Sequence, residues 1–294
     1  MGVLSVSPVY RHGQVRPAEL EGDIKGKPAL DMPQPACASA SVLDDTRAVA
    51  VSGINRTVCG VINPDDVLER QLLDQGFLRV AGIDECGRGS AAGPASVGVV
   101  VVDISALEAG APSGIRDSKM LTPDGRDRLV DPIQGWAVAS AVAHSYPDEI
   151  DLIGINKALR AAARRALASV GEFDVVILDG KFDWLAEDEL NLFDDTTSST
   201  DHDAVRKAAT SERALLTGRI RTVMRIGADR TCVSVAAASI LAKVSHDAHM
   251  AELEELYPGY GWLRHNGYLT EGHRQAIREK GLSPAHRRTW KIPD

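Results

Sequence analysis

Two adjacent carboxylates, Asp84 and Glu85, end an apolar run and precede a glycine-rich stretch with one arginine, GIDECGRGSAAGP (82–94). Two further acids, Asp179 and Asp229, also follow apolar runs. Carboxylates held close together raise one another's cost of ionisation, and a divalent cation relieves that cost. Oxygen ligands without His or Cys favour Mg²⁺ or Mn²⁺ over zinc. Two such ions about 4 Å apart can clamp the attacking and leaving oxygens of a phosphodiester displacement, so these acids are predicted to be metal ligands.

Each of these acids alone has a simpler interpretation as a helix cap or a turn residue. Their common position favours a shared site, because ligands gather outside the carboxyl ends of strands in mixed sheets. The stretch Gly87, Arg88 and Gly89 also favours a shared binding site. Its glycines allow backbone N–H groups to turn toward a phosphate or sugar, although an isolated G-R-G is more often a plain turn.

The elements that must position these residues follow from hydrophobic periodicity and β-branched runs. Three runs close together predict an antiparallel meander with little helix between its strands, and two later runs complete a five-stranded sheet. The predicted strands are LRVAGID (78–84), SVGVVVVD (96–103), GWAVASAVAHS (135–145), FDVVILDG (173–180) and IRTVMRIGAD (220–229).

Amphipathic segments predict the helices that flank this sheet. One helix opens the folded part, an Ala-rich helix makes a strand–helix–strand crossover, and a long helix begins just past Asp229. These segments are PDDVLERQLLDQGF (64–77), INKALRAAARRALASV (155–170) and SVAAASILAKVSHDAHMAELEEL (234–256).

Composition changes along the chain predict its domain organisation. Residues 1–64 are rich in Pro, Gly, Ser and Ala and read as a flexible or weakly ordered extension, although TRAVAVSG and RTVCGVI leave a small ordered domain open. Residues 65–294 are expected to form the folded domain that carries the four acids, with an acidic insertion at about 182–203 that holds eight acids and no Lys or Arg. From residue 204 onward, 15 basic residues face nine acidic ones, net +6, within a total charge of −8. The basic C-terminal third therefore favours nucleic-acid contact despite the acidic total.

The remaining features exclude other classes. The four cysteines are widely spaced and read as free thiols in a reducing compartment, and no apolar run is long enough for a membrane span, so a cytoplasmic protein is expected. His246 and His249 lie three residues apart on the long predicted helix. A metal pair there would need a third ligand from elsewhere, so a solvent-facing helix surface is the better interpretation.

Seven motifs, in order, make the chain resemble the bacterial ribonuclease HII family over roughly residues 65–294. They are AGIDECGRGSAAGP (81–94), DSK (117–119), EID (149–151), LDG (178–180), AAASILAKV (236–244), YPGYGW (257–262) and HRRTW (286–290).

The resemblance implies an RNase H-like fold with a five-stranded mixed sheet, flanking helices and a C-terminal helical substrate-binding region at about 231–294. It implies that Asp84, Glu85, Asp179 and Asp229 are the catalytic and metal-binding acids, with two Mn²⁺ or Mg²⁺ ions during catalysis. The implied activity is hydrolysis of the RNA strand of RNA–DNA hybrids and nicking 5′ to single ribonucleotides in duplex DNA, leaving 3′-hydroxyl and 5′-phosphate ends. The protein is expected to be a monomer.

The resemblance also assigns substrate-binding residues. Gly87, Arg88, Gly89 and Tyr268 correspond to the residues that contact the ribose 2′-OH, the one group that tells RNA from DNA at a given nucleotide. Lys119 in DSK is expected to meet a backbone phosphate, although an exposed lysine with no such role is also possible.

Three departures from the family pattern touch these assignments. Asn266 stands where the family usually has lysine and Leu269 where it has a small residue or proline, so both positions bear on the junction preference. Gly227 replaces a lysine that commonly precedes the last acid. Two alternatives remain: a ribonuclease HIII-like hybrid-specific nuclease, which Arg88 disfavours because that family has a G-K-G loop, and a catalytically silent nucleic-acid-binding protein.

Overall fold

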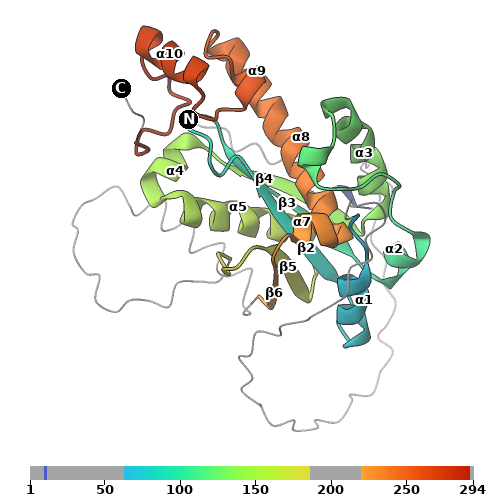
Figure 1. Cartoon of the computed structure of the whole chain (residues 1–294). Helices are drawn as coiled ribbons and strands as arrows, with labels where there is room; N and C mark the ends of the chain where they lie inside the picture. Colours follow the sequence, from blue (N-terminus) through green and yellow to red (C-terminus); the bar gives the residue numbers. More distant parts are fainter. Residues whose placement is uncertain (1–9, 12–62, 186–219, 292–294) are drawn as a thin grey trace, which may run out of the picture.

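The computed structural model describes residues 10–11, 63–185 and 220–291, and its centre is a mixed sheet (Figure 1). The strand order is β1-β4-β3-β2-β5-β6. β2, β3 and β4 form an antiparallel meander, whereas β2–β5 and β5–β6 pair in parallel. All five predicted strands are present, and a two-residue strand from the N-terminal extension adds a sixth. The bounds are β1 Tyr10–Arg11, β2 Val80–Cys86, β3 Ala95–Val102, β4 Ala139–Ser145, β5 Val175–Asp179 and β6 Thr222–Arg225.

Two long helices cover opposite faces of the sheet (Figure 1). α8 (Val233–Leu256) packs on β2 and β3, and α5 (Ile155–Val170) packs on β3 and β4. The close approach of α8 requires glycine in the sheet, because a Cβ at Gly82 would collide with the backbone of Ser234 and one at Gly98 with the carbonyl of Ala238. The small residues at the start of α8 therefore let backbone pack on backbone.

The prediction of little helix between the first three strands is wrong for the link between β3 and β4. That link holds α2 (Ile104–Ala109), the 3₁₀ helix η1 (Ser118–Met120) and α3 (Pro123–Trp136). Pro132 inside α3 lowers its intrinsic helix propensity. The buried Leu129 and Ile133 and the Thr122 N-cap outweigh that cost.

Shorter helices complete the described chain. They are α1 (Val67–Asp74), α4 (Pro147–Ile153), α7 (Ala228–Thr231), α9 (Trp262–His265) and α10 (Glu271–Lys280). Together with α8, the last two make up the helical region expected at about 231–294, and they pack beyond the end of α8 (Figure 1). Among the described residues no helix has the length and apolarity to cross a bilayer.

Some predictions fall outside the described residues. These are the order of residues 1–64, apart from β1 and the last two positions, and all of the acidic insertion beyond residue 185. Two of the four cysteines are described, and Cys86 and Cys232 are both free thiols as expected.

A buried carboxyl group joins α1 to the start of α8. Glu69 is fully buried, and its Oε1 accepts hydrogen bonds from the backbone N–H of Ser234 at 2.9 Å and from its hydroxyl at 2.6 Å. Glu69 Oε2 has no hydrogen-bond partner among the described residues. Burial raises the pKa of Glu69 to about 7, so near neutral pH the fold is divided between its protonated and ionised forms.

We expect Glu69→Gln to stabilise the protein more at pH 8 than at pH 5. An acid whose pKa is raised by folding weakens the fold as pH rises from its unfolded value near 4.5 toward about 7, and Gln keeps an acceptor without the charge. The difference in free energy of unfolding between variant and wild type should grow by about 1–3 kcal/mol over that range. Urea unfolding at both pH values measures it, with the exposed Glu172→Gln as control. An equal difference at both pH values would contradict the assignment.

Candidate metal and nucleic-acid site

The four predicted acids meet at one edge of the sheet. Asp84 and Glu85 lie near the end of β2, Asp179 ends the neighbouring parallel strand β5, and Asp229 lies in α7 just after β6. The backbone N–H of Ala228 donates to Asp179 Oδ1 at 2.9 Å, which fixes α7 against the end of β5. Asp84 and Asp229 are both buried.

Burial and mutual repulsion raise the pKa of these acids. The pKa of Asp84 is raised well above its usual range, first by burial and then by Glu85 and Asp229. The pKa of Glu85 is raised by burial, with Asp179 adding to the effect. Charge interactions thus link all four acids, and the cluster lacks enough positive charge of its own.

Asp117 is a fifth acid at this site that sequence reasoning missed as a participant. It is buried, its Oδ1 accepts from the backbone N–H of Lys119 at 3.0 Å, and it adds to burial in raising the pKa of Asp229. Its signal was the DSK motif, of which only the lysine had been given a role. Lys119 Nζ lies 3.5 Å from Asp229 Oδ2, so the lysine that was expected to contact a backbone phosphate lies beside the acids.

The chemistry of this donor set suits a hard divalent cation, because it is made of carboxylate oxygens whose charge is only partly balanced. As they stand, no three His, Cys, Asp or Glu side chains within residues 63–185 and 220–291 are arranged to hold a metal ion. A cation would therefore have to draw the carboxylates closer together.

The glycine-rich loop lies directly beside the acids. Gly87 has φ +77°, and a Cβ there would lie 2.5 Å from His246 Nε2 and 2.6 Å from the Pro94 carbonyl oxygen, so only glycine fits. The Arg88 guanidinium lies 3.4 Å from Glu85 Oε1 and donates to Asn156 Oδ1 at 2.8 Å.

Arg287 holds this loop from behind, and sequence reasoning gave it no role although it lies in the quoted HRRTW motif. The side chain is fully buried, and burial lowers its pKa to about 10. Its guanidinium donates to the carbonyl oxygens of Gly87 at 2.6 Å, Arg88 at 3.0 Å, and Gly93 and Pro94 at 3.1 Å. One side chain thus binds both ends of the loop.

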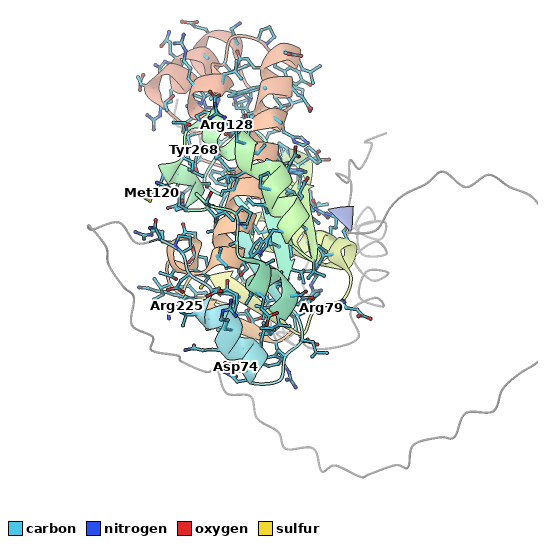
Figure 2. The ribbon with its side chains drawn as sticks, turned by 90° about the vertical axis from the view of Figure 1, so that its right-hand side faces the viewer. Asp74, Arg79, Met120, Arg128, Arg225 and Tyr268 are labelled. Atoms are coloured by element: carbon cyan, nitrogen blue, oxygen red, sulfur yellow. The ribbon has the colours of Figure 1, made fainter. Side chains whose placement is uncertain are left out.

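Tyr268, the tyrosine assigned to the ribose by resemblance, lies against the loop. Its Cε1 atom is 3.3 Å from where a Cβ on Gly89 would lie, and Glu85 and Lys119 are among the charged groups that act on its hydroxyl. Figure 2 shows Tyr268 where the C-terminal helices meet the rest of the molecule. Burial raises its pKa, so the hydroxyl stays protonated and can donate a hydrogen bond at neutral pH.

Hydrogen bonds connect the Tyr268 segment to the glycine-rich loop. Ser90 Oγ donates to the carbonyl of Asn266 at 2.9 Å, and the N–H of Ala91 donates to the carbonyl of Gly267 at 2.8 Å. Asn266, one of the departures from the family pattern, has φ +47°, a conformation that Asn tolerates better than most residues. Its backbone ends α9, so this departure is compatible with the position of Tyr268.

The expectation that His246 faces solvent is wrong. It is fully buried, because the glycine-rich loop covers this part of α8, and its Nε2 packs against Gly87. His249 is partly buried and shares a 3.0 Å hydrogen bond with the hydroxyl of Tyr146.

Comparison with known proteins identifies the family of this chain. The family model described as Ribonuclease HII matches residues 81–292. The chain belongs to the ribonuclease HII family. A ribonuclease HII of Streptomyces avermitilis is 35% identical over 79% of this chain and 85% of the relative. One of Ruegeria pomeroyi is 36% identical over 79% of this chain and 84% of the relative.

Solved structures support the fold. The ribonuclease H2 of Pyrococcus horikoshii OT3 matches with a TM-score of 0.55 and 27% identity, covering 73% of this chain and 95% of that one. Membership in the ribonuclease HII family makes the protein a ribonuclease H-type hydrolase that acts on RNA–DNA substrates and depends on divalent metal.

We expect Arg287→Met to destabilise the fold by about 2–4 kcal/mol, because four inward carbonyl oxygens lose their donor in a dry environment. Native-state hydrogen exchange should show the largest loss of protection at Ala91 and Gly93, whose N–H groups donate to Gly267 and Ala285. The neighbouring Arg288→Met is the control, because Arg288 bonds Asp151 through its backbone N–H. Unchanged protection at Ala91 and Gly93 in Arg287→Met would refute this role.

Proposed function

We propose that this protein nicks duplex DNA on the 5′ side of single embedded ribonucleotides and hydrolyses the RNA strand of RNA–DNA hybrids, leaving 3′-hydroxyl and 5′-phosphate ends. The observation that supports this most is the meeting of the acid cluster with the glycine-rich loop and Tyr268. Acids that suit hydrolysis of a phosphodiester thus lie beside groups that suit recognition of a ribose.

Asp84, Glu85, Asp179 and Asp229 would hold the cations. Two Mg²⁺ or Mn²⁺ ions bound there would activate the attacking water and stabilise charge on the leaving oxygen. The protein's own contribution is to gather the carboxylates at one edge of the sheet, and the Ala228 N–H orients Asp179. Lys119 lies beside Asp229 with its side chain 76% exposed, so it is placed to reach a backbone phosphate.

Recognition of the ribose depends on the loop and Tyr268. Because Arg287 binds the carbonyl oxygens of Gly87 and Arg88 from within, the peptide groups that follow them turn their N–H groups the other way. Those N–H groups and the protonated Tyr268 hydroxyl are the donors and acceptor that a 2′-OH can use. A deoxyribose leaves them unpaired, which gives the selection for RNA a physical basis.

We expect Asp84→Asn to lower the cleavage rate of a duplex with one internal ribonucleotide at least about 100-fold while the protein stays folded. In chelator the variant should melt at the same temperature as wild type or above it, because a buried, repelled charge is removed. Mn²⁺ should raise the melting temperature of wild type and raise that of the variant less.

The control for that variant is Asp74→Asn, an exposed acid at the far end of the molecule (Figure 2). Cleavage of the duplex by Asp84→Asn at near the wild-type rate with Mn²⁺ would exclude Asp84 as a ligand. Wild type that cuts only long hybrids would favour the ribonuclease HIII-like alternative, and wild type that cuts nothing would favour the silent binder.

We expect Tyr268→Phe to reduce the kcat/KM for a single-ribonucleotide duplex about 10-fold, the value of one hydrogen bond to the 2′-OH. Replacing that 2′-OH by fluorine should then lower the kcat/KM of the variant clearly less than that of wild type, because the hydroxyl of Tyr268 is already absent from the variant. Tyr257→Phe, outside the site, serves as the control. Equal fluorine effects in variant and wild type would place the 2′-OH contact elsewhere.

A further inference from the structure

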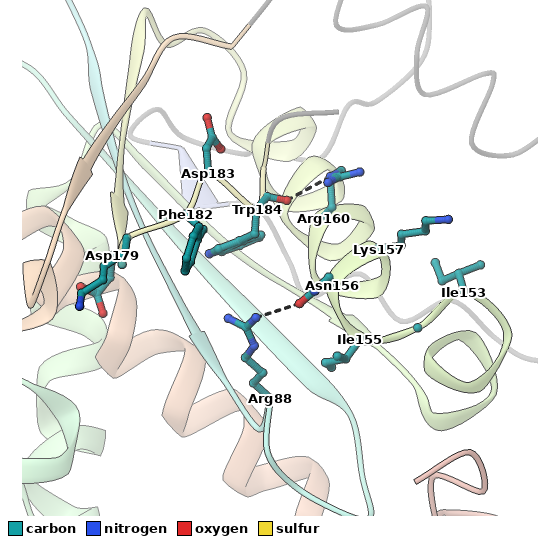
Figure 3. A pocket seen from close by; sticks show the side chains of 13 residues that line it. Arg88, Ile153, Ile155, Asn156, Lys157, Arg160, Asp179, Phe182, Asp183 and Trp184 are labelled. Atoms are coloured by element: carbon teal, nitrogen blue, oxygen red, sulfur yellow. Dashed lines mark hydrogen bonds between the residues drawn. The ribbon is translucent and has the colours of Figure 1, made fainter. Parts of the chain in front are cut away.

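A cleft of about 520 Å³ opens beside the acids, between the start of α5 and the segment that follows β5 (Figure 3). The cleft shares Arg88 and Asp179 with the acid cluster and the glycine-rich loop. A group bound in the cleft would therefore lie next to the phosphodiester that the acids are proposed to cleave. The lining of the cleft is Arg88, residues 153–157, Arg160 and residues 179–184.

The charge of the cleft favours an anion. Four cationic side chains line it, against the two carboxylates of Asp179 and Asp183. Arg160 is held in place because its Nε donates to the carbonyl of Trp184 at 3.0 Å. The cationic residues are Arg88, Lys157, Arg160 and Lys181.

Trp184 gives the cleft a specific donor. Trp184 lines the cleft and the residue is 8% exposed, and its buried Nε1–H has no hydrogen-bond partner among the described residues. Figure 3 shows the ring directed into the cleft, between Phe182 and Asn156. A buried indole N–H without an acceptor is costly, so an oxygen atom from a ligand would be stabilising there.

The N-terminus of α5 contributes a second set of donors. This helix has 16 residues, and no side chain caps its N-terminus, which follows Gly154. The uncapped first-turn N–H groups carry partial positive charge and favour a phosphate. Asn156 and Lys157 of that turn both line the cleft.

We propose that this cleft binds a backbone phosphate of the cleaved strand, within two phosphates of the scissile one. The inference deepens the proposed function and rests on it for the identity of the strand. Trp184 Nε1, the first turn of α5, Lys157 and Arg88 hold the phosphate oxygens. The subsite thereby fixes the register in which the strand lies over the acids.

The test uses single-ribonucleotide duplexes in which each of the four phosphates nearest the scissile one is replaced in turn by a neutral methylphosphonate. For wild type, one replacement should lower kcat/KM about 10-fold, the cost of losing charge-assisted hydrogen bonds. Trp184→Phe and Lys157→Gln should each lose activity on the unmodified duplex. At the sensitive position, methylphosphonate should lower the kcat/KM of each variant by less than about 3-fold, because the side chain that contacts this phosphate is already missing.

Matched control variants distinguish loss of the phosphate contact from loss of structure. Trp136→Phe removes an indole that donates to the Ala106 carbonyl on α2, and Arg79→Gln removes a cation at the start of β2. Neither control should change the methylphosphonate profile. Lys157→Gln changes an exposed residue, so its result stands even if Trp184→Phe folds poorly.

Dissociation constants for the same duplexes, measured by fluorescence anisotropy in chelator, give a reading that does not need cleavage. Methylphosphonate at the position that lowers kcat/KM should also raise the dissociation constant of the duplex for wild type. It should leave the dissociation constants of the two variants unchanged. A wild type indifferent to all four replacements, or variants that lose as much as wild type, would overturn the cleft assignment while leaving ribonucleotide cleavage intact. Failure of the proposed function would instead appear as absence of metal-dependent nicking by wild type.

Discussion

The site depends on one buried guanidinium. A loop that turns N–H groups outward toward a substrate must turn carbonyl oxygens inward, where water cannot reach them. Arg287 supplies donors to four of those oxygens, and its planar fork suits several acceptors better than a lysine would. Burying the charge is costly, as its lowered pKa shows, and the four carbonyls offset that cost. The far C-terminal segment is therefore a structural part of the loop that follows β2.

Packing of α8 on the sheet places the acids as well as stabilising the core. Because Gly82 and Gly98 lack side chains, the helix lies close enough for Ser239 to hydrogen bond Asp84, which opposes the rise in that acid's pKa. Ser239 also lies 2.8 Å from the Ser118 hydroxyl, which brings the DSK segment to the same place. Small residues on α8 thus connect core packing with the position of a repelled carboxylate.

The sequence predicted what local patterns encode. Five strands, helix α5 and the start of α8 to within one residue followed from periodicity, and the acids followed from their places at strand ends. Helix α3 was missed although Thr122 and Pro123 form a local helix-start signal, because Pro132 lies inside the helix and lowers its intrinsic propensity. Burial of Leu129 and Ile133, which depends on the rest of the fold, offsets that cost. The role of Arg287 and the burial of His246 were missed for another reason. Both arise from contacts with the glycine-rich loop, which is far away in sequence, and no local pattern reports such contacts.

Arg88 lies where the acids, the cleft and the glycine-rich loop meet, and its geometry explains why arginine suits the position. One arm of its guanidinium reaches the Glu85 carboxylate and the other reaches the Asn156 amide at the cleft, while its backbone belongs to the loop beside Tyr268. Lysine has a single ammonium group and lacks the planar fork that spans two such partners. A strand that entered the cleft would compete with Asn156 for this guanidinium, and a cation at the acids would compete with it for Glu85. If the cleft binds the strand and the acids bind cations as proposed, these two events would be coupled through one side chain.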